Sequence, residues 1–135
     1  VGCLPCLSGG AVDETVGKIK AMGGPAFAIA GDMSAKTTPK RVVEAVVAEF
    51  GRIDILINNA GMIRRTPAVD FSEEDWSTVI EVNLSSVFRT SQAAGRYMID
   101  QGSGKLVNIA SLLSFQGGVT GPASKASNSG VAGIP

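Results

Sequence analysis

Histidine is absent from this sequence of 135 residues, and cysteine occurs only twice. Without histidine the chain can form neither a Ser-His-Asp or Cys-His catalytic arrangement nor a histidine-ligated metal site. Cys3 and Cys6 form a C-x-x-C pair, but a zinc site needs further ligands, and a redox pair belongs at a helix start that follows a strand. We therefore expect no metal, and we interpret residues 1–11 as a ragged N-terminal segment.

An excess of charge of one sign is also absent, because 12 lysines and arginines balance 12 aspartates and glutamates. No basic stripe is visible that would attract nucleic acid or an anionic membrane surface. The apolar stretches, such as residues 26–30, are far too short to span a bilayer. With 44% hydrophobic and 18% charged residues, the composition is that of a globular domain. We expect a cytoplasmic protein that binds neither nucleic acid nor membrane.

Apolar spacing along the chain predicts helices and short strands in alternation. Helices are expected over residues 12–22, 38–50, 73–101 and 124–133, and strands over 26–30, 53–57 and 106–110. The strands are largely apolar on both faces, which is typical of parallel strands covered by helices. We therefore predict an α/β fold with a three-layer arrangement around a parallel sheet. Thr38 and Ser72 are expected to cap the N-termini of their helices.

Polar or small residues follow each predicted strand. Asp32 comes after the first, residues 58–61 (Asn-Asn-Ala-Gly) after the second, and Ser111 after the third. Ligands of open α/β sheets bind beyond the carboxyl ends of the strands, so we expect these residues to surround one site. Asn83 falls on the apolar face of the helix predicted over 73–101, where a buried amide requires hydrogen-bond partners.

In this order the motifs resemble the short-chain dehydrogenase/reductase family over nearly all of residues 12–134. The matching pieces are residues 31–34, 58–61, 82–84 and 108–111. The resemblance implies that residues 12–135 form part of an NAD(P)-binding Rossmann-like domain. Its doubly wound parallel sheet would lack the family's first strands and its C-terminal part.

The resemblance also implies a role for each motif residue. Cofactor-binding roles fall on Asp32, Met33, Asn59, Ala60 and Gly61. Asn83 would hold a proton-relay water, and Ser111 would hydrogen-bond the reacting oxygen of the substrate. Purely structural explanations stay open beside these roles: a turn at Asp32 with Ser34, a strand-end hydrogen bond at residues 58–59, and a core hydrogen bond at Asn83.

Residues 61–67 and 111–118 are similar to one branch of the family, the gluconate and 2-dehydro-3-deoxygluconate 5-dehydrogenases. Arg64 and Arg65 would suit an acidic sugar, because a guanidinium pairs with a carboxylate through two hydrogen bonds. The alternative is that these adjacent arginines belong to a solvated surface loop. The implied substrate is therefore a small molecule, and the implied cofactor is NAD or NADP.

The sequence departs from the family at its catalytic pair, a Tyr-x-x-x-Lys in which tyrosine is the general acid/base and lysine lowers its pKa. Counted from Ser111, these positions fall on Ser124 and Asn128. A serine without a nearby base cannot ionise at neutral pH. The family's Gly-rich phosphate loop is also absent from the sequence.

Three interpretations follow. In the first, the chain is a piece of a parent enzyme that transfers hydride between NAD(P) and a hydroxyl or ketone. In the second, it is a catalytically silent relative that associates with other copies, as a homo-oligomer, through the helix over 73–101. In the third, it has no function. We expect the chain itself to be inactive and its isolated fold to be marginal. The unit most able to stand alone spans the strand at 53–57 to the strand at 106–110.

Overall fold

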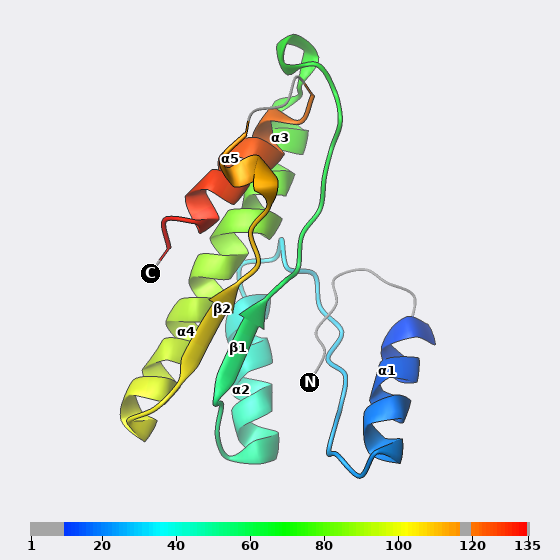
Figure 1. The fold of residues 1–135 in the computed structure, drawn as a ribbon, viewed down its shortest axis with the longest axis vertical. Helices are drawn as coiled ribbons and strands as arrows, with labels where there is room; N and C mark the ends of the chain where they lie inside the picture. The colour runs from blue at the N-terminus through cyan, green and yellow to red at the C-terminus, as the bar shows by residue number, and fades with distance from the viewer. Residues whose placement is uncertain (1–9, 117–119, 135) are drawn as a thin grey trace.

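The computed structural model describes residues 10–116 and 120–134. The helices are α1 (Gly10–Ala21), α2 (Thr38–Phe50), α3 (Glu73–Ile80), α4 (Ser86–Gln101) and α5 (Pro122–Val131). The strands are β1 (Ile55–Asn58) and β2 (Lys105–Asn108), and short helical turns are η1 (Ala68–Asp70), η2 (Glu81–Ser85) and η3 (Leu112–Ser114). From α2 onward, helical segments and strands alternate along the chain (Figure 1), whereas α1 and α2 follow each other without a strand between them. Cys3 and Cys6 lie outside the described residues.

The strands β1 and β2 pair in parallel, with Ile55 opposite Lys105 and Asn58 opposite Asn108. The chain between them passes through α3, η2 and α4 (Figure 1), so the unit is a β-α-β crossover. This confirms the predicted parallel sheet. It also places the carboxyl ends of both strands at the same edge, where the loops after Asn58 and Asn108 begin.

The strand predicted over residues 26–30 is not formed in the described part of the chain, and this prediction is corrected. Only Ala28 in this stretch has the bridge pairing of a strand residue. A strand requires a neighbouring strand to complete its hydrogen bonds, and the sheet of the described residues contains β1 and β2 alone. Phe27 and Ile29 instead pack against the core, with the Phe27 ring centroid 5.5 Å from that of Phe50.

The core lies where α2 and α4 pack against each other and against one face of the sheet. Its buried members are Val43, Val46, Ile53, Ala94 and Met98. The apolar stripe predicted on α2 accounts for the first two. The opposite face of the sheet is open among the described residues: Ile55 is 61% exposed, Ile57 58% and Ile109 52%. The described residues therefore form two of the three predicted layers.

The two predicted helix caps have different outcomes. Ser72 caps α3, because its side chain accepts a hydrogen bond from Asp75 N at 3.1 Å. Thr38 does not cap α2 but is its first residue, and Thr37 before it makes no side-chain cap bond. The chain is already wound at this point, since Thr38 N donates to Ala35 O at 3.1 Å. A preceding turn therefore takes the place of the predicted side-chain cap.

The long helix predicted over residues 73–101 is present, but it is interrupted by the π turn η2. In this turn Ser86 N donates to Glu81 O, five residues earlier. A π turn inserts one extra residue into a helix and locally changes which side chains face inward. The helical pattern of the sequence did not predict this insertion, which falls around Asn83.

Candidate functional site

Asn58 ties the ends of the two strands together. Its side-chain nitrogen donates to Asn108 Oδ1 at 2.9 Å and to Ser91 Oγ of α4 at 3.0 Å. Asn58 is 9% exposed, and a buried amide without such partners would destabilise the fold. The structural explanation of Asn58 is thus the one that the contacts support. The adjacent Asn59 is exposed and directs its side chain toward the space beyond the strand.

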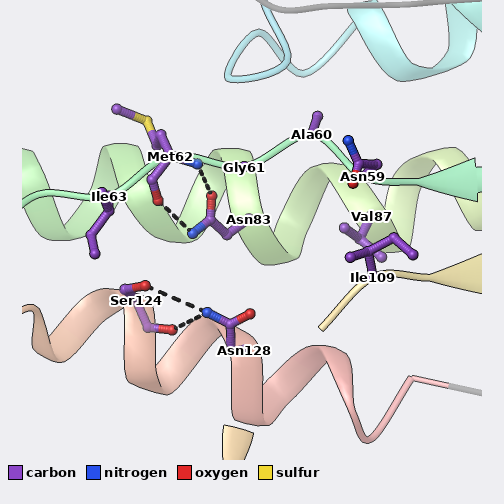
Figure 2. A pocket seen from close by; sticks show the side chains of 10 residues that line it. All are labelled: Asn59, Ala60, Gly61, Met62, Ile63, Asn83, Val87, Ile109, Ser124 and Asn128. Carbon is purple, nitrogen blue, oxygen red and sulfur yellow. Dashed lines mark hydrogen bonds between the residues drawn. The ribbon is translucent and has the colours of Figure 1, made fainter. Parts of the chain in front are cut away.

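The loop that follows β1 is held against the long helix by Asn83. The side-chain oxygen of Asn83 accepts a hydrogen bond from Met62 N at 2.8 Å, and its nitrogen donates to Met62 O at 2.8 Å (Figure 2). Asn83 also donates to Ser127 Oγ of α5 at 3.3 Å. One side chain in the π turn therefore joins the loop, the long helix and α5.

Further along, the same loop is attached to the start of α5. Pro67 forms an antiparallel bridge with Thr120. Gly121 has φ of 95°, in the left-handed region that favours glycine. A side chain built on Gly121 would have its Cβ 3.3 Å from the carbonyl oxygen of Arg64. The close approach therefore depends on glycine, and it fixes the distance between the loop and α5.

These contacts enclose a cavity of about 250 Å3 beyond the strand ends (Figure 2). It is lined by Asn59, Ala60, Gly61, Met62, Ile63, Asn83, Val87, Ile109, Ser124 and Asn128. Six of the predicted site residues are in this set: Asn59, Ala60, Gly61, Asn83, Ser124 and Asn128. The apolar members Met62, Ile63, Val87 and Ile109 were not predicted as site residues, although Ile109 belongs to the motif at residues 108–111. None of these lining residues is ionisable, so the cavity can offer hydrogen bonds but no charge and no proton at neutral pH.

Ser124 and Asn128 lie one turn apart on α5 and are bonded to each other. Asn128 Nδ2 donates to Ser124 O at 2.7 Å and to Ser124 Oγ at 3.4 Å (Figure 2). Ser124 is 5% exposed. The spacing that would place an acid/base and its cation on one face is thus present, but the groups that occupy it are a hydroxyl and an amide.

Ser111 lies on the turn after β2 and does not line the cavity. The turn is anchored by Ser114, whose hydroxyl accepts from Ser111 N at 3.4 Å and donates to Asn128 O at 3.0 Å. The carbonyl of Ser114 accepts from Lys125 Nζ and Ser129 Oγ, each at 3.0 Å. Sequence reasoning missed Ser114, because a second serine three residues after the first carries no signal of its own.

Asp32 and Met33, the first two of the predicted cofactor-binding residues, differ in their surroundings. Asp32 is exposed, and its carboxylate accepts from Ser34 N at 2.9 Å and Ser34 Oγ at 2.8 Å. The backbone hydrogen bond, followed by the side-chain one, lowers the pKa of Asp32 below its ordinary value. Met33 is 6% exposed and lines a smaller cavity of about 100 Å3 with Asn59 and Ala60. The pair Asn59-Ala60 therefore stands between the two cavities.

Arg64 does not line either cavity. Its Nε donates to Asp75 Oδ1 of α3 at 3.2 Å, and the two side chains are partly exposed, at 49% and 38%. Arg65 is exposed as well. Among residues 10–116 and 120–134, no cluster of three or more acidic or thiol side chains could hold a metal ion. No helix of the same residues combines the length and apolar character that crossing a membrane requires.

The fold and the strand-end motifs can be compared with known proteins. Residues 7–134 match the family model for short chain dehydrogenases. The chain belongs to the short-chain dehydrogenase family. The resemblance inferred from the motifs is thereby confirmed, together with the Rossmann-like fold class.

Individual relatives show which branch of the short-chain dehydrogenase family this chain is similar to. Over 122 residues the chain is 49% identical to a 2-dehydro-3-deoxy-D-gluconate 5-dehydrogenase of Dickeya dadantii, covering 90% of this chain and 48% of that protein. The corresponding Escherichia coli enzyme is 48% identical with the same coverage. A gluconate 5-dehydrogenase structure from Burkholderia cenocepacia, in complex with NADP and tartrate, superposes with a TM-score of 0.83 at 30% identity, covering 96% of this chain and 51% of that one. The chain spans about half the length of these relatives.

Proposed function

We propose that this chain carries part of a binding site for NAD or NADP and a sugar acid, and that it does not itself transfer hydride. The complete parent protein would interconvert a hydroxyl and a ketone on the sugar acid. The observation that carries this proposal is the uncharged cavity between the loop after β1 and α5. It lies beyond the strand ends, where open α/β sheets bind ligands.

The binding part of the proposal is supported by the position of the motif residues. Asn59, Ala60 and Gly61 border the cavity, and Met33 borders the adjoining one. We propose that the ribose lies along residues 59–61 and that the adenine lies toward Met33, with Asp32 nearby at the surface. The Burkholderia cenocepacia relative was solved with NADP and the dicarboxylic acid tartrate, which supports a phosphorylated dinucleotide and an acidic substrate for the parent.

For the substrate, we propose that Ser111 hydrogen-bonds the reacting oxygen and that Arg64 approaches the acid group. Arg64 is paired with Asp75 in the free chain, so a carboxylate ligand would exchange one anionic partner for another. At this partly exposed site such an exchange needs only modest additional desolvation. Both polar atoms of the Asn83 side chain already bond Met62, and its nitrogen also bonds Ser127. Asn83 would therefore hold the relay water only through the hydrogen-bonding capacity that these contacts leave.

The inactive part of the proposal is supported by Ser124 and Asn128. Proton transfer at neutral pH needs a group whose pKa lies near the pH, and no residue that lines the cavity has one. The hydroxyl of Ser124 and the amide of Asn128 hydrogen-bond each other. An amide has no charge with which to stabilise an alkoxide. Hydride transfer would therefore lack its matching proton transfer.

Two measurements on the 135-residue chain test these parts separately. Absorbance of the reduced cofactor, recorded with gluconate or 2-dehydro-3-deoxygluconate and either nicotinamide dinucleotide, should show no turnover. Calorimetric titration with NADP should show saturable binding that Asn59→Ala weakens about tenfold, since the exposed Asn59 borders both cavities. Gln92→Ala removes an exposed amide of α4 instead and should leave the affinity unchanged. Turnover by the purified chain overturns the inactive assignment, and absence of saturable binding overturns the cofactor site.

A second function, association with another copy of the chain, is favoured by the outer face of α4. Phe88 is 54% exposed and Ile99 is 80% exposed, and residues eleven apart in a helix share one face. Gly95 lies between them, and a side chain built there would meet no atom within 4 Å. A face with large apolar ends and a small middle residue allows a second helix to approach closely. We propose that two copies pack through this face.

A further inference from the structure

A bidentate ion pair spans the π turn that carries Asn83. Arg89 Nη1 donates to Glu81 Oε2 at 2.6 Å, and Nη2 donates to Oε1 at 3.3 Å. The two side chains are only 27% and 31% exposed. Arg52 also binds a carboxylate through two nitrogens, that of Asp54, but these side chains are 60% and 54% exposed. The Glu81–Arg89 pair is therefore better shielded from solvent than an ordinary surface pair, which contributes little.

The spacing of this pair depends on the π turn. Glu81 and Arg89 are eight residues apart, and in a plain α-helix residues with this spacing point about 80° apart around the axis. Removing the extra residue of a π turn leaves the equivalent of seven residues, which point only about 20° apart. The two side chains face each other because η2 (Glu81–Ser85) lies between them. Pair and turn therefore stabilise each other.

We infer that the Glu81–Arg89 pair fixes the π turn and so positions Asn83 against Met62, which makes both charged residues positioning residues of the cavity. Neither residue lines the cavity. They act through the helix geometry that presents Asn83.

The link from the turn to the cavity is the direction of the Asn83 side chain. If η2 reverted to α geometry, one half of the helix would rotate against the other by about 100°, one residue step. The N-terminal half is held by the Ser72 cap, and the C-terminal half by Thr90 and Ala94 in the buried interior. Asn83 stands between these fixed halves, so it would lose its paired hydrogen bonds with Met62. The loop after β1 would then lose its attachment to the helix.

The amide hydrogen exchange of Met62, followed by NMR in the ligand-free chain, tests this inference. Arg89→Ala should speed exchange at Met62 at least tenfold. Arg89→Lys keeps the charge but not the two-pronged geometry, and it should give an intermediate rate. The exchanged pair Glu81→Arg with Arg89→Glu should restore slow exchange. Lys18→Ala, which breaks the exposed pair with Glu14 on α1, should leave Met62 unchanged.

Two results would overturn the inference: unchanged Met62 exchange in Arg89→Ala, or fast exchange that the charge reversal does not restore. If Arg89→Ala does not fold, the same test compares Met62 exchange in Arg89→Lys with that in the charge-reversed double variant. The inference rests on the proposed function only where it treats the cavity as a ligand-binding site. Because exchange is measured without ligand, failed NADP binding with an intact exchange response would overturn the proposed function alone.

Discussion

Asn83 hydrogen-bonds the backbone of Met62 in both directions, with an N···O distance of 2.8 Å each way. A carboxamide carries the same donor and acceptor as a peptide group. The Asn83 side chain therefore supplies the backbone of the loop with hydrogen-bond partners, as a neighbouring strand does for β1. Its second donor contact, to Ser127 Oγ at 3.3 Å, extends the link to α5. Asn83 therefore joins three walls of the cavity: the loop after β1, the long helix and α5.

Removing this link should destabilise the chain. Asn83→Ala leaves both polar groups of Met62 without their partner, and we expect the free energy of unfolding to fall by about 2 kcal/mol. Asn83→Asp keeps the acceptor but sets a carboxylate against the Met62 carbonyl, so it should cost at least as much. Urea unfolding followed by circular dichroism measures both. Gln92→Ala, the control, should change the free energy of unfolding by less than about 0.5 kcal/mol. If Asn83→Ala changed it by no more than this control does, the link would not be structural.

Gly130 on α5 faces the side chain of Leu84. A Cβ at this position would lie 2.9 Å from two methyl carbons of Leu84, which belongs to the π turn. Gly130→Ala should therefore force the flexible end of the Leu84 side chain to shift, and this strain should offset the roughly 1 kcal/mol that alanine gains over glycine inside a helix. Gly17→Ala in α1 is the matched control, because nothing lies within 4 Å of its Cβ. That change should raise stability by up to about 1 kcal/mol, and thermal unfolding compares the two.

Stability should decrease in acid as Glu81 and Asp32, two carboxylates with a lowered pKa, become protonated. The pKa of Glu81 lies below its ordinary value of 4.5, chiefly because Arg89 hydrogen-bonds the carboxylate; desolvation opposes this, and Ser85 and Lys36 add smaller contributions. The pKa of Asp32 lies below 3.8 because of Ser34. A carboxylate with a lowered pKa stabilises the fold above its unfolded pKa, and this contribution is lost as the pH falls through the folded value.

Glu81→Gln should therefore flatten the part of the stability–pH curve that begins near pH 4.5, and Asp32→Asn the part that begins near pH 3.8. Urea midpoints measured at closely spaced pH values distinguish the two variants. Both effects should be modest, because Asp32 is exposed and Glu81 is partly so, and solvent screens such groups. A curve that neither substitution alters would assign the acid sensitivity to other groups.

The outer face of α4 should control association. Ile99→Glu places a charge on a side chain that is 80% exposed, so the monomer should fold unchanged while a pair of copies would bury that charge unpaired. Sedimentation should then show the wild-type chain as a dimer and the variant as a monomer. Met22→Glu, at an equally exposed apolar position of 79% just after α1, should leave the dimer intact. A monomeric wild-type chain would contradict the proposed interface.

Most of the fold follows from local patterns in the sequence. The stripe of Val42, Val43 and Val46 predicts α2 and its buried face, and Ser72 with the acids after it predicts the start of α3. The stretch at residues 26–30 has an equally clear strand pattern but does not form a strand. Secondary structure of this kind depends on partners elsewhere in the chain, and a local pattern contains no information about their presence.

The candidate site was predictable in its composition but less so in its geometry. The cavity beyond the strand ends brings Asn59, Ala60 and Gly61 together with Asn83 and Ser124, whereas Asp32 and Ser111 of the strand-end set do not line it. The π turn was not predictable, because one inserted residue leaves the apolar spacing almost unchanged. The pairing of Arg64 with Asp75 was also missed, since it joins a loop to a helix eleven residues later.

The open face of the sheet changes what substitutions there would reveal. Ile57 has the sequence character of a residue buried between two layers, yet 58% of it is exposed. Its neighbour Leu56 packs against the core from the same strand. A saturation scan of β1 should therefore alternate, with polar residues tolerated at 55 and 57 and rejected at 56. This result would show that the stability of this chain does not require apolar residues at positions 55 and 57. These two positions would then be the first to change when a more soluble form is wanted.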